Sequence, residues 1–326
     1  MMTKNFKYQL SIVTVFLSVF LLRAQQNLDL TLYPEDFVAT HWKEVNTASL
    51  DISEVAFVNW NSGGSNSISG LFGLEVQRNY NKDHLLWENR AIIRYGVNKQ
   101  QNQSLRKTDD ILELKSRFGF RKDTKSNWYY SANFSFATQF TNGYNYSNSD
   151  EKPISQFMAP AYMFLGVGTV YGEHIEEFSA YMSPLTLKST FVLDQDLADA
   201  GSFGVTPATY DILGNKLTNG KNTREEVGIL LTSAYENVLM ENISVRTLVS
   251  LYTDYLNGFG NVDVDWELNF KFKVNDHVRA TMGSHIKYDN DVKTVVEDDD
   301  MPEETVIKGA KVQWKQLLGV GVSVDF

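Results

Sequence analysis

The sequence predicts an antiparallel transmembrane β-barrel of about twelve strands. The first observation is a two-residue period, shown best by the C-terminal stretch 310–326, where Leu318, Val320, Val322 and Val324 alternate with polar residues or glycine. A strand with this period has one apolar and one polar face. The second observation is that links of two length classes alternate along the chain. Outer-membrane barrels combine both features, since their short periplasmic turns alternate with longer extracellular loops.

The N-terminus has the pattern of a secretory signal peptide. Lys4 and Lys7 precede the apolar run Leu10 to Leu22, and Ala24 offers a small-residue cleavage site. The alternative is an anchoring helix, but the run has about thirteen residues and a bilayer span needs ~20. We therefore expect a signal peptide over residues 1–24 and a barrel over 45–326. Residues 25–44 form either a periplasmic lead-in or a plug, and the sequence leaves both open.

Strand signals follow one another from Val45 onward. Apolar alternation, ended by turn residues, marks twelve segments, and a phase slip near Pro184 predicts a bulge because proline cannot donate to a ladder. In chain order the expected strands are 48–60, 68–80, 85–97, 112–120, 128–140, 157–171, 175–193, 223–235, 243–255, 262–274, 278–288 and 310–326.

The connecting segments distinguish the two ends of this barrel. Links after even-numbered strands are short, at 81–84, 122–127, 172–174, 236–241 and 275–277. Links after odd-numbered strands reach 141–156, 194–222 and 293–308. Both termini are then expected in the periplasm, and the longest loop is expected to fold into the barrel mouth as a lid or plug.

Aromatic residues are expected to form two girdles at the membrane interfaces. Trp87 and Trp128 begin strands at the short-turn end, whereas Trp60 and Trp314 lie towards the long loops, and Trp266 is assigned to the same set. Phe326 is expected to end the closing strand. The last strand is similar to the C-terminal strand of outer-membrane barrels, which ends in Phe and is read by their assembly machinery.

The polar parity of the strands is heavily charged, and we expect these side chains to line the lumen. The candidates are Glu88, Arg90, Arg94, Glu113, Lys115, Arg117, Arg224, Glu226, Arg246, Asp263, Asp265, Glu267, Lys271, Arg279, His285 and Lys287. In a wide barrel they would line a wet channel, with Asp263, Asp265 and Glu267 as a selectivity ring. In a narrow barrel they would pair across the lumen and close it. The narrow case is favoured, and both stay open.

No pattern of catalytic or metal-binding residues stands out. Gly-x-Ser-x-Gly is absent, and His285 is expected beside Lys287 and Arg279 without a carboxylate to orient it. The acidic loop 297–304 lacks the spacing of a calcium loop, so a solvated surface is the expected reading, with divalent-cation binding as the alternative. We expect no enzymatic activity, no cofactor and no resident metal.

Composition restricts the compartment and the partners. The chain of 326 residues has a formal net charge of -10 and no cysteine. An acidic chain is a poor partner for nucleic acid, and the lack of cysteine excludes a disulfide scaffold. Expected partners are outer-membrane lipid, the barrel-assembly machinery and a small solute or ion.

Several short motifs resemble one family over nearly the whole mature chain. They include the segments 55–64, 106–110, 128–131, 143–146, 198–205 and 317–321. These segments resemble a family of Bacteroidetes proteins known as domain of unknown function 3078. The resemblance implies a secreted outer-membrane barrel of a Gram-negative bacterium with unknown activity. We therefore expect a passive channel or transporter for small solutes, or alternatively a non-conducting barrel that binds a partner through its long loops.

Overall fold

The computed structural model describes residues 41–56, 65–146, 152–172, 177–297 and 305–326, without the side chains of 293–308. The chain divides into two units, Met1–Thr40 and His41–Phe326, and only the second lies within the described residues. The expected signal peptide, most of the lead-in, Trp60 and all but the first residue of the acidic loop 297–304 fall outside them. Among the described helices, none is long and apolar enough to cross a membrane.

The described unit consists almost entirely of strands. Its elements are β1 (Trp42–Val55), β2 (Ser67–Lys82), β3 (Leu85–Gln100), β4 (Arg106–Phe120), β5 (Trp128–Thr138), β6 (Ala161–Tyr171), β7 (Phe178–Phe191), α2 (Gln195–Asp199), η1 (Ser202–Gly204), β8 (Thr209–Tyr210), β9 (Lys216–Thr218), β10 (Thr223–Met240), β11 (Ile243–Asp254), β12 (Asp263–Lys273), β13 (Val278–Tyr288), β14 (Lys293–Glu297), β15 (Thr305–Ala310) and β16 (Gln313–Asp325).

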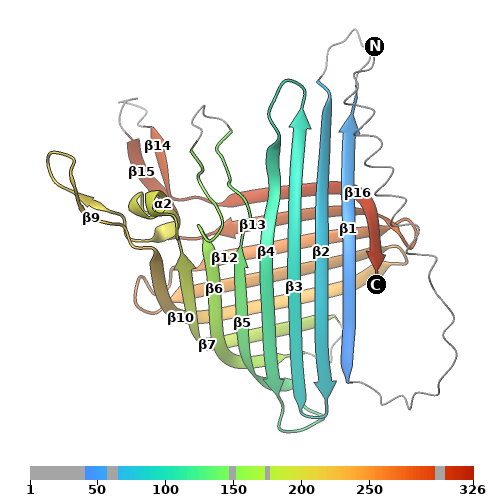
Figure 1. The fold of residues 1–326 in the computed structure, drawn as a ribbon. Helices are drawn as coiled ribbons and strands as arrows, with labels where there is room; N and C mark the ends of the chain where they lie inside the picture. The colour runs from blue at the N-terminus through green and yellow to red at the C-terminus, as the bar shows by residue number, and fades with distance from the viewer. Residues whose placement is uncertain (1–40, 57–64, 147–151, 173–176, 298–304) are drawn as a thin grey trace, which may run out of the picture. The chain divides into compact units, whose positions relative to one another are not determined.

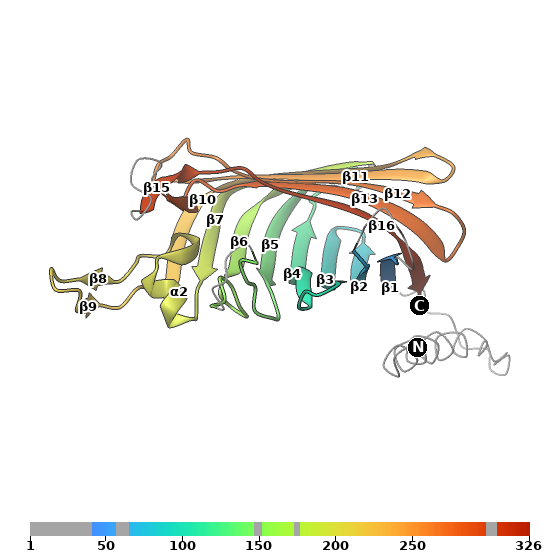
Figure 2. The same cartoon turned by 90° about the horizontal axis from the view of Figure 1, so that it is seen from above.

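Twelve of these strands close into one antiparallel barrel, which confirms the predicted fold class. The order around the barrel is β1-β16-β13-β12-β11-β10-β7-β6-β5-β4-β3-β2. Closure joins the first and last strands of the described unit, because β1 pairs with β16. In Figure 1 the strands β1 to β7 cross in front of β10 to β13 at a steep angle, and Figure 2 shows the two groups as facing layers.

The strand boundaries differ from expectation mainly at the first and fourth strands. β1 begins at Trp42, so Trp42 to Glu44 extend the barrel rather than the lead-in. β4 begins at Arg106, before the apolar alternation, because a polar segment completes the ladder with β3. The two small hairpins β8–β9 and β14–β15, which lie within long links, were not expected from the sequence.

The bulge expected near Pro184 is present. The register of β7 shifts against both neighbours, between Gly228 and Leu230 on β10 and between Val167 and Thr169 on β6. The shift inverts the parity of β7 beyond the proline. As a consequence Lys188 faces the same interior as the residues that precede the bulge.

The two ends of the barrel differ in their links. One end, called the short-turn end below, carries 83–84, 121–127, 172–177, 241–242 and 274–277. The other, called the long-loop end, carries 56–66, 101–105, 139–160, 192–222, 255–262 and 289–312. The short-turn end is therefore the end at which β1 begins.

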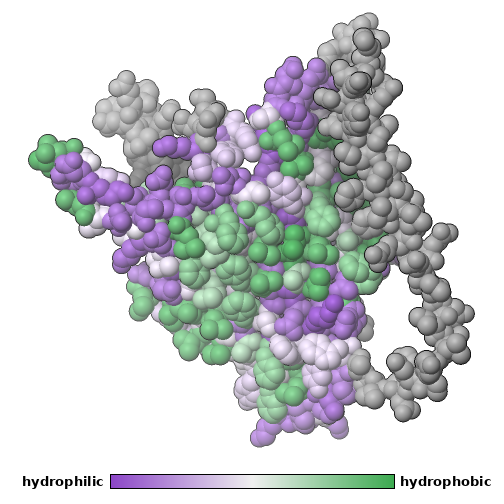
Figure 3. All heavy atoms as spheres, viewed as in Figure 1, coloured by the Kyte–Doolittle hydropathy of each residue, from purple (hydrophilic) through white to green (hydrophobic). Residues whose placement is uncertain are grey.

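Apolar side chains cover the outer wall. Figure 3 shows them gathered in a broad band across the strands of the viewed face, with polar side chains towards the loops. On the C-terminal strand Leu318 is 75% exposed and Val320 is 58% exposed. A large apolar surface that faces outward marks a surface made for a partner or for lipid, and an apolar band around a barrel is the form that lipid requires.

Candidate functional site

The lumen is crossed at the long-loop end by an ion-paired cluster centred on Lys188. This side chain is 4% exposed. Its Nζ lies 2.8 Å from Oδ2 of Asp263 and 3.5 Å from carboxylate oxygens of both Glu226 and Asp289. The strands β10 and β11 lie between β7, which carries Lys188, and β12, which carries Asp263. The contact therefore spans the interior instead of joining neighbouring strands.

Arg224 extends this cluster towards the loops. Its Nη2 lies 2.6 Å from Oδ2 of Asp291 and 3.4 Å from Glu226, and its Nη1 donates to the carbonyl oxygen of Gly204 in the longest loop. Lys188, Arg224, Glu226, Asp263, Asp289 and Asp291 are called the mouth cluster below. With Asp254, Asn257 and Asn261, members of the cluster line a small polar pocket. Acidic groups outnumber the two cations there, so the mouth carries a negative excess.

The mouth cluster contains a group of three carboxylates close enough to share a cation. One oxygen each of Asp263, Asp289 and Asp291 lies within 4.8 Å of the others. These groups are already engaged, since Lys188 bonds Asp263 and Arg224 bonds Asp291. Lys188 and Arg224 therefore already supply positive charge to the carboxylates that a divalent ion would use.

A second contact across the interior joins β16 to β4. Nζ of Lys315 lies 2.8 Å from Oδ1 of Asp109, whose Oδ2 lies 3.1 Å from Nε of Arg94. Three strands separate β16 from β4 around the wall. Because Asp109 is 8% exposed in this contact, the pair helps to fill the same end of the lumen.

The remaining lumen candidates form pairs that mostly join adjacent strands. Arg90 binds Glu75, Lys115 binds Glu113, and Arg117 binds Glu88. The longer contacts are Arg246 with Glu236 and Arg279 with Asp51, each at 3.7 Å. Lys271 is exposed. Most of these pairs lie along the wall, so the narrowing of the lumen at the long-loop end rests on the contacts of Lys188 and Lys315 that cross the interior.

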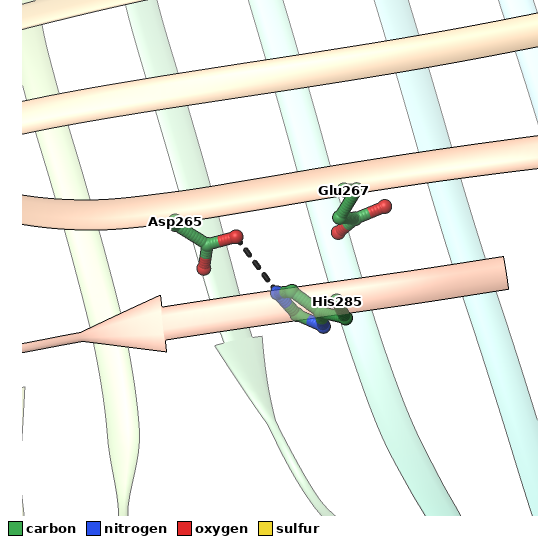
Figure 4. Close-up of side chains that lie close together, drawn as sticks. All are labelled: Asp265, Glu267 and His285. Carbon is green, nitrogen blue, oxygen red and sulfur yellow. Dashed lines mark hydrogen bonds and ion pairs between the residues drawn. The ribbon is translucent and has the colours of Figure 1, made fainter. Parts of the chain in front are cut away.

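His285 has a carboxylate partner, which corrects the expectation of a purely cationic neighbourhood. Its Nε2 lies 2.8 Å from Oδ1 of Asp265, and Lys287 approaches the other oxygen of that carboxylate at 3.2 Å. Glu267 completes a group of three potential ligands (Figure 4). The expectation failed because β12 and β13 pair with Glu267 opposite His285 and Asp265 opposite Lys287, a register that the sequence does not show.

An apolar cluster fills the lumen nearer the short-turn end. Leu86, Tyr129, Val170 and Tyr181 are buried together, and Leu230 packs against them. They come from β3, β5, β6, β7 and β10, so this contact also joins separated parts of the wall. The lumen is thus narrowed at two levels, by charge at one and by apolar packing at the other.

The four described tryptophans of the expected girdles are all partly exposed, at 43% for Trp87, 57% for Trp128, 41% for Trp266 and 67% for Trp314. Trp87 and Trp128 lie at the short-turn end. Trp266 and Trp314 both pair with Ile286, so they belong to one row of the wall. Trp60 lies outside the described residues. Trp42, which was assigned to the lead-in, lies beside Trp87, with ring centroids 5.7 Å apart and ring planes inclined at 59°.

Phe326 lies against the first strand. Its N–H donates to the carbonyl oxygen of Asn46 at 3.0 Å, and Nδ2 of Asn46 donates to the carbonyl oxygen of Phe326 at 2.7 Å. The aromatic ring itself is on the surface, since the residue is 71% exposed.

The longest loop, 192–222, has a fixed base and a protruding tip. Asp199 holds the base, because its carboxylate accepts hydrogen bonds from Lys216, from the Gly220 N–H and from Gln195. The hydrogen bond from Lys216, followed by that from Gly220, lowers the pKa of Asp199 from 3.8 to about 2. At the tip Ile212 is fully exposed. Only the base reaches the mouth cluster, through Gly204.

Sequence reasoning missed the central residue of the site. Lys188 follows the Pro184 bulge, where β7 contains one extra residue. Alternation along β7 places Lys188 on the lumen side only when this extra residue is taken into account. Glu75, Asp51 and Asp109 were missed as well, although each is an acidic residue on the polar parity of a strand, and that signal identifies them.

Comparison with known families confirms the stated resemblance over the first part of the barrel, but not over nearly the whole mature chain. Residues 52–144 match the family "Protein of unknown function (DUF3078)", and residues 204–302 match the family "Protein of unknown function, DUF481". Neither description assigns an activity. No curated protein matches the sequence.

Solved outer-membrane proteins share a distant likeness with the chain. An outer-membrane channel from Pseudomonas putida F1 has 12% identity and a TM-score of 0.39, over 90% of this chain and 100% of that one. Outer membrane phospholipase A from Escherichia coli has 11% identity and a TM-score of 0.36, over 90% and 94%. The translocator domain of the autotransporter NalP from Neisseria meningitidis has 8% identity and a TM-score of 0.36, over 87% of each chain.

Proposed function

We propose that the protein is an outer-membrane barrel of a Gram-negative bacterium that forms a narrow passive passage for small solutes or ions. The long-loop end faces the cell exterior, because outer-membrane barrels keep their short turns in the periplasm. The observation that supports a passage is the mouth cluster. Buried, ion-paired side chains rather than a packed apolar core close this end of the lumen.

The charge of the mouth cluster determines what would pass. A ring of carboxylates favours cations, and the mouth carries more carboxylates than cationic groups. Lys188 holds three of these carboxylates together. When its charge is removed, the carboxylates repel one another and attract cations, so that the constriction widens and becomes more cation-selective.

Single-channel recording in planar bilayers tests this proposal. We expect small conductance steps from the wild type and larger, more cation-selective steps from Lys188→Met. Lys125→Met changes an exposed residue in a short turn and serves as the control, which should conduct like the wild type. Migration on a denaturing gel before and after heating verifies that each variant is folded. Absence of current from both folded wild type and folded Lys188→Met would remove the passage.

A non-conducting, partner-binding barrel is the second candidate, and the tip of the longest loop favours it. Ile212 is 101% exposed and Leu213 is 81% exposed. Asp211 fixes the turn that presents them, since its Oδ1 accepts from the N–H groups of Leu213 and Asn215. If the barrel passes no current and Ile212→Ser/Leu213→Ser abolishes a function of intact cells while the barrel still folds, this candidate replaces the first.

Assembly is proposed to depend on Phe326 through the barrel-assembly machinery. Phe326→Ala leaves the ladder with β1 intact, because the contacts of Phe326 with Asn46 use backbone groups of Phe326. We expect normal refolding of the variant in detergent but a reduced amount in outer membranes of cells. We propose no catalytic role, since His285 hydrogen-bonds only to Asp265 among the described residues.

A further inference from the structure

The inner face of β12 and β13 brings two carboxylates and one imidazole together. Glu267 of β12 lies directly opposite His285 of β13, and Asp265 lies two residues before Glu267 on the same face of β12. Directly opposite and diagonal side chains of an antiparallel pair are within reach of each other. One ligand atom from each of the three residues lies within 4.8 Å of the others, and Figure 4 shows the three side chains close together. They are called the lumen triad below.

The lumen triad lies next to the mouth cluster. Asp263, a member of that cluster, and Asp265 are successive residues on the same face of β12. Asp263 reaches Lys188 across the interior, so this face of β12 is the inner one. The side chain of Asp265 is 42% exposed and that of His285 is 23% exposed. Because both side chains face the interior, their exposed surface borders water in the lumen, which leaves room for an ion beside them.

The contacts of the triad leave ligand atoms available. The carboxylate of Glu267 has no hydrogen bond and no ion pair within the residues that the structure describes. Nε2 of His285 lies 2.8 Å from Oδ1 of Asp265, and Lys287 contacts only the other oxygen, Oδ2, at 3.2 Å. Two ligand atoms of one zinc ion lie about 3 Å apart, since each bond is ~2.0–2.2 Å long. The imidazole and the carboxylate of Asp265 therefore already have the spacing of two ligands of one ion.

The neighbouring cations do not fill the position of a metal ion. Lys315 lies opposite His285 on β16, but its Nζ binds Asp109 at 2.8 Å. Arg246 of β11 lies near Glu236, at 3.7 Å. Lys287 is thus the lysine that contacts the triad, and its single charge faces the two carboxylates of Asp265 and Glu267. The group keeps a net negative charge, which favours a cation.

We propose that the lumen triad binds a divalent transition-metal ion of the zinc class. One imidazole nitrogen and two carboxylate oxygens form the mixed donor set that suits Zn²⁺ and its neighbours, whereas Ca²⁺ takes about six to eight oxygen ligands. Three protein ligands leave one coordination position to water from the lumen. The mouth cluster, with its excess of carboxylates, concentrates cations beside the site. The sequence alone does not predict the triad, because it does not show the register that places Glu267 opposite His285.

Isothermal titration calorimetry with ZnCl₂ measures the binding. The barrel is titrated in detergent without a polyhistidine tag, and an excess of Mg²⁺ occupies acidic groups on the surface. We expect the wild type to bind Zn²⁺, and we expect Glu267→Gln, Asp265→Asn and His285→Gln each to weaken binding by about tenfold or more. His277→Gln changes an exposed histidine in a short turn and serves as the control, which should bind like the wild type.

Glu267→Gln is the most informative of these variants. Its carboxylate has no described hydrogen bond or ion pair to lose, so the variant should fold like the wild type, and migration on a denaturing gel before and after heating verifies this. Lys287→Met gives a change in the opposite direction. It removes a positive charge that competes for Asp265, so zinc should bind several-fold more tightly. A hydrogen-bonded pair that holds no ion would show neither change.

Co²⁺ reports the ligands directly, because its visible absorption depends on the atoms that coordinate it. We expect absorption bands of bound Co²⁺ in the wild type and in His277→Gln, and their loss in His285→Gln. Zn²⁺ should displace Co²⁺ and abolish the bands, since zinc binds such donors more tightly than cobalt.

Three results would overturn the site. The first is absence of zinc binding by the folded wild type, and the second is equal affinity in the wild type and Glu267→Gln, which would place the zinc elsewhere. The third is equal affinity for Zn²⁺ and Ca²⁺, which would mean unspecific attraction to acidic groups. These measurements do not involve current. A folded barrel that binds zinc but never conducts would remove the passage and leave the site, whereas conduction without zinc binding would remove the site alone.

Discussion

Replacement of Lys188 by Met is the most demanding test of how the mouth is built. The substitution keeps the length of the side chain and removes one buried charge. Nζ lies 2.8 Å from Asp263 and 5.1 Å from the ring centre of Tyr252, so the lost contacts include a direct ion pair and a cation–π contact. Removal of one partner from a buried ion pair destabilises a protein by about 3–5 kcal/mol. We expect a loss of that size in Lys188→Met.

Unfolding by urea in lipid vesicles, followed by tryptophan fluorescence, measures this loss. Lys287→Met serves as the reference, because Lys287 is 49% exposed and its pair with Asp265 is worth about 1 kcal/mol or less. The triple variant Lys188→Met/Asp263→Asn/Glu226→Gln should recover most of the stability, since removal of both partners is nearly neutral. A loss below about 1 kcal/mol in Lys188→Met, or no recovery in the triple variant, would refute the argument that a buried charge network holds the mouth.

Three other outcomes follow from the geometry. Gly168→Ala should destabilise the barrel by about 1–3 kcal/mol in the same urea assay, because its Cβ would clash with a backbone carbonyl oxygen of β7, whereas Gly70→Ala has open space and should be neutral. The pKa of Asp199 is lowered from 3.8 to about 2, so the base of the longest loop should keep its full stability above pH 3.8 and lose it as the pH falls through about 2. Protease resistance of the loop reports this change. Asp199→Asn should lower the resistance above pH 3.8 and remove its dependence on pH between 3.8 and 2. Reversal of charge in Asp265→Lys/Glu267→Lys should shift ion selectivity towards anions in bilayer recordings, and an unchanged reversal potential would show that these residues do not face the conducting path.

Strand alternation made most of the wall predictable, because each strand has an apolar outer face and a polar inner face. The expected segment 278–288 coincides with β13, and the expected segment 85–97 begins with β3 but ends before Gln100. The hairpins inside the long links were not, since short strands in polar loops are stabilised by local turns and have no apolar face. Asp211, which caps the tip of one of them, is an example of such a local cause.

The inner face was predictable as a set of charges but not as a set of contacts. Parity places Asp263 and Glu226 inside, yet it does not say that Lys188, which lies opposite Glu226 on the neighbouring strand, also reaches Asp263 beyond β10 and β11. That contact depends on the curvature of the wall and on the bulge at Pro184. For the same reason His285 received a carboxylate partner that its own strand does not contain. Contacts between strands depend on the register of their pairing. That register is set by the whole assembled sheet and cannot be deduced from the sequence of one strand.

β16 changes its pairing partner at Gly321, which pairs with both β13 and β1. This arrangement bears on the order in which the barrel folds and closes. Thr47 and Asp325 are separated by nearly the whole folded unit, and contacts so distant along the chain form late because loop closure opposes them. The adjacent hairpins have no such obstacle. The expected folding precursor is thus a curved sheet in which the first and last strands are not yet paired. In the final step only the segment from Thr47 to Asp51 of β1 pairs with β16. Because the pairing between β1 and β16 is short, the barrel can close last and can open locally there while the other strand pairs stay intact.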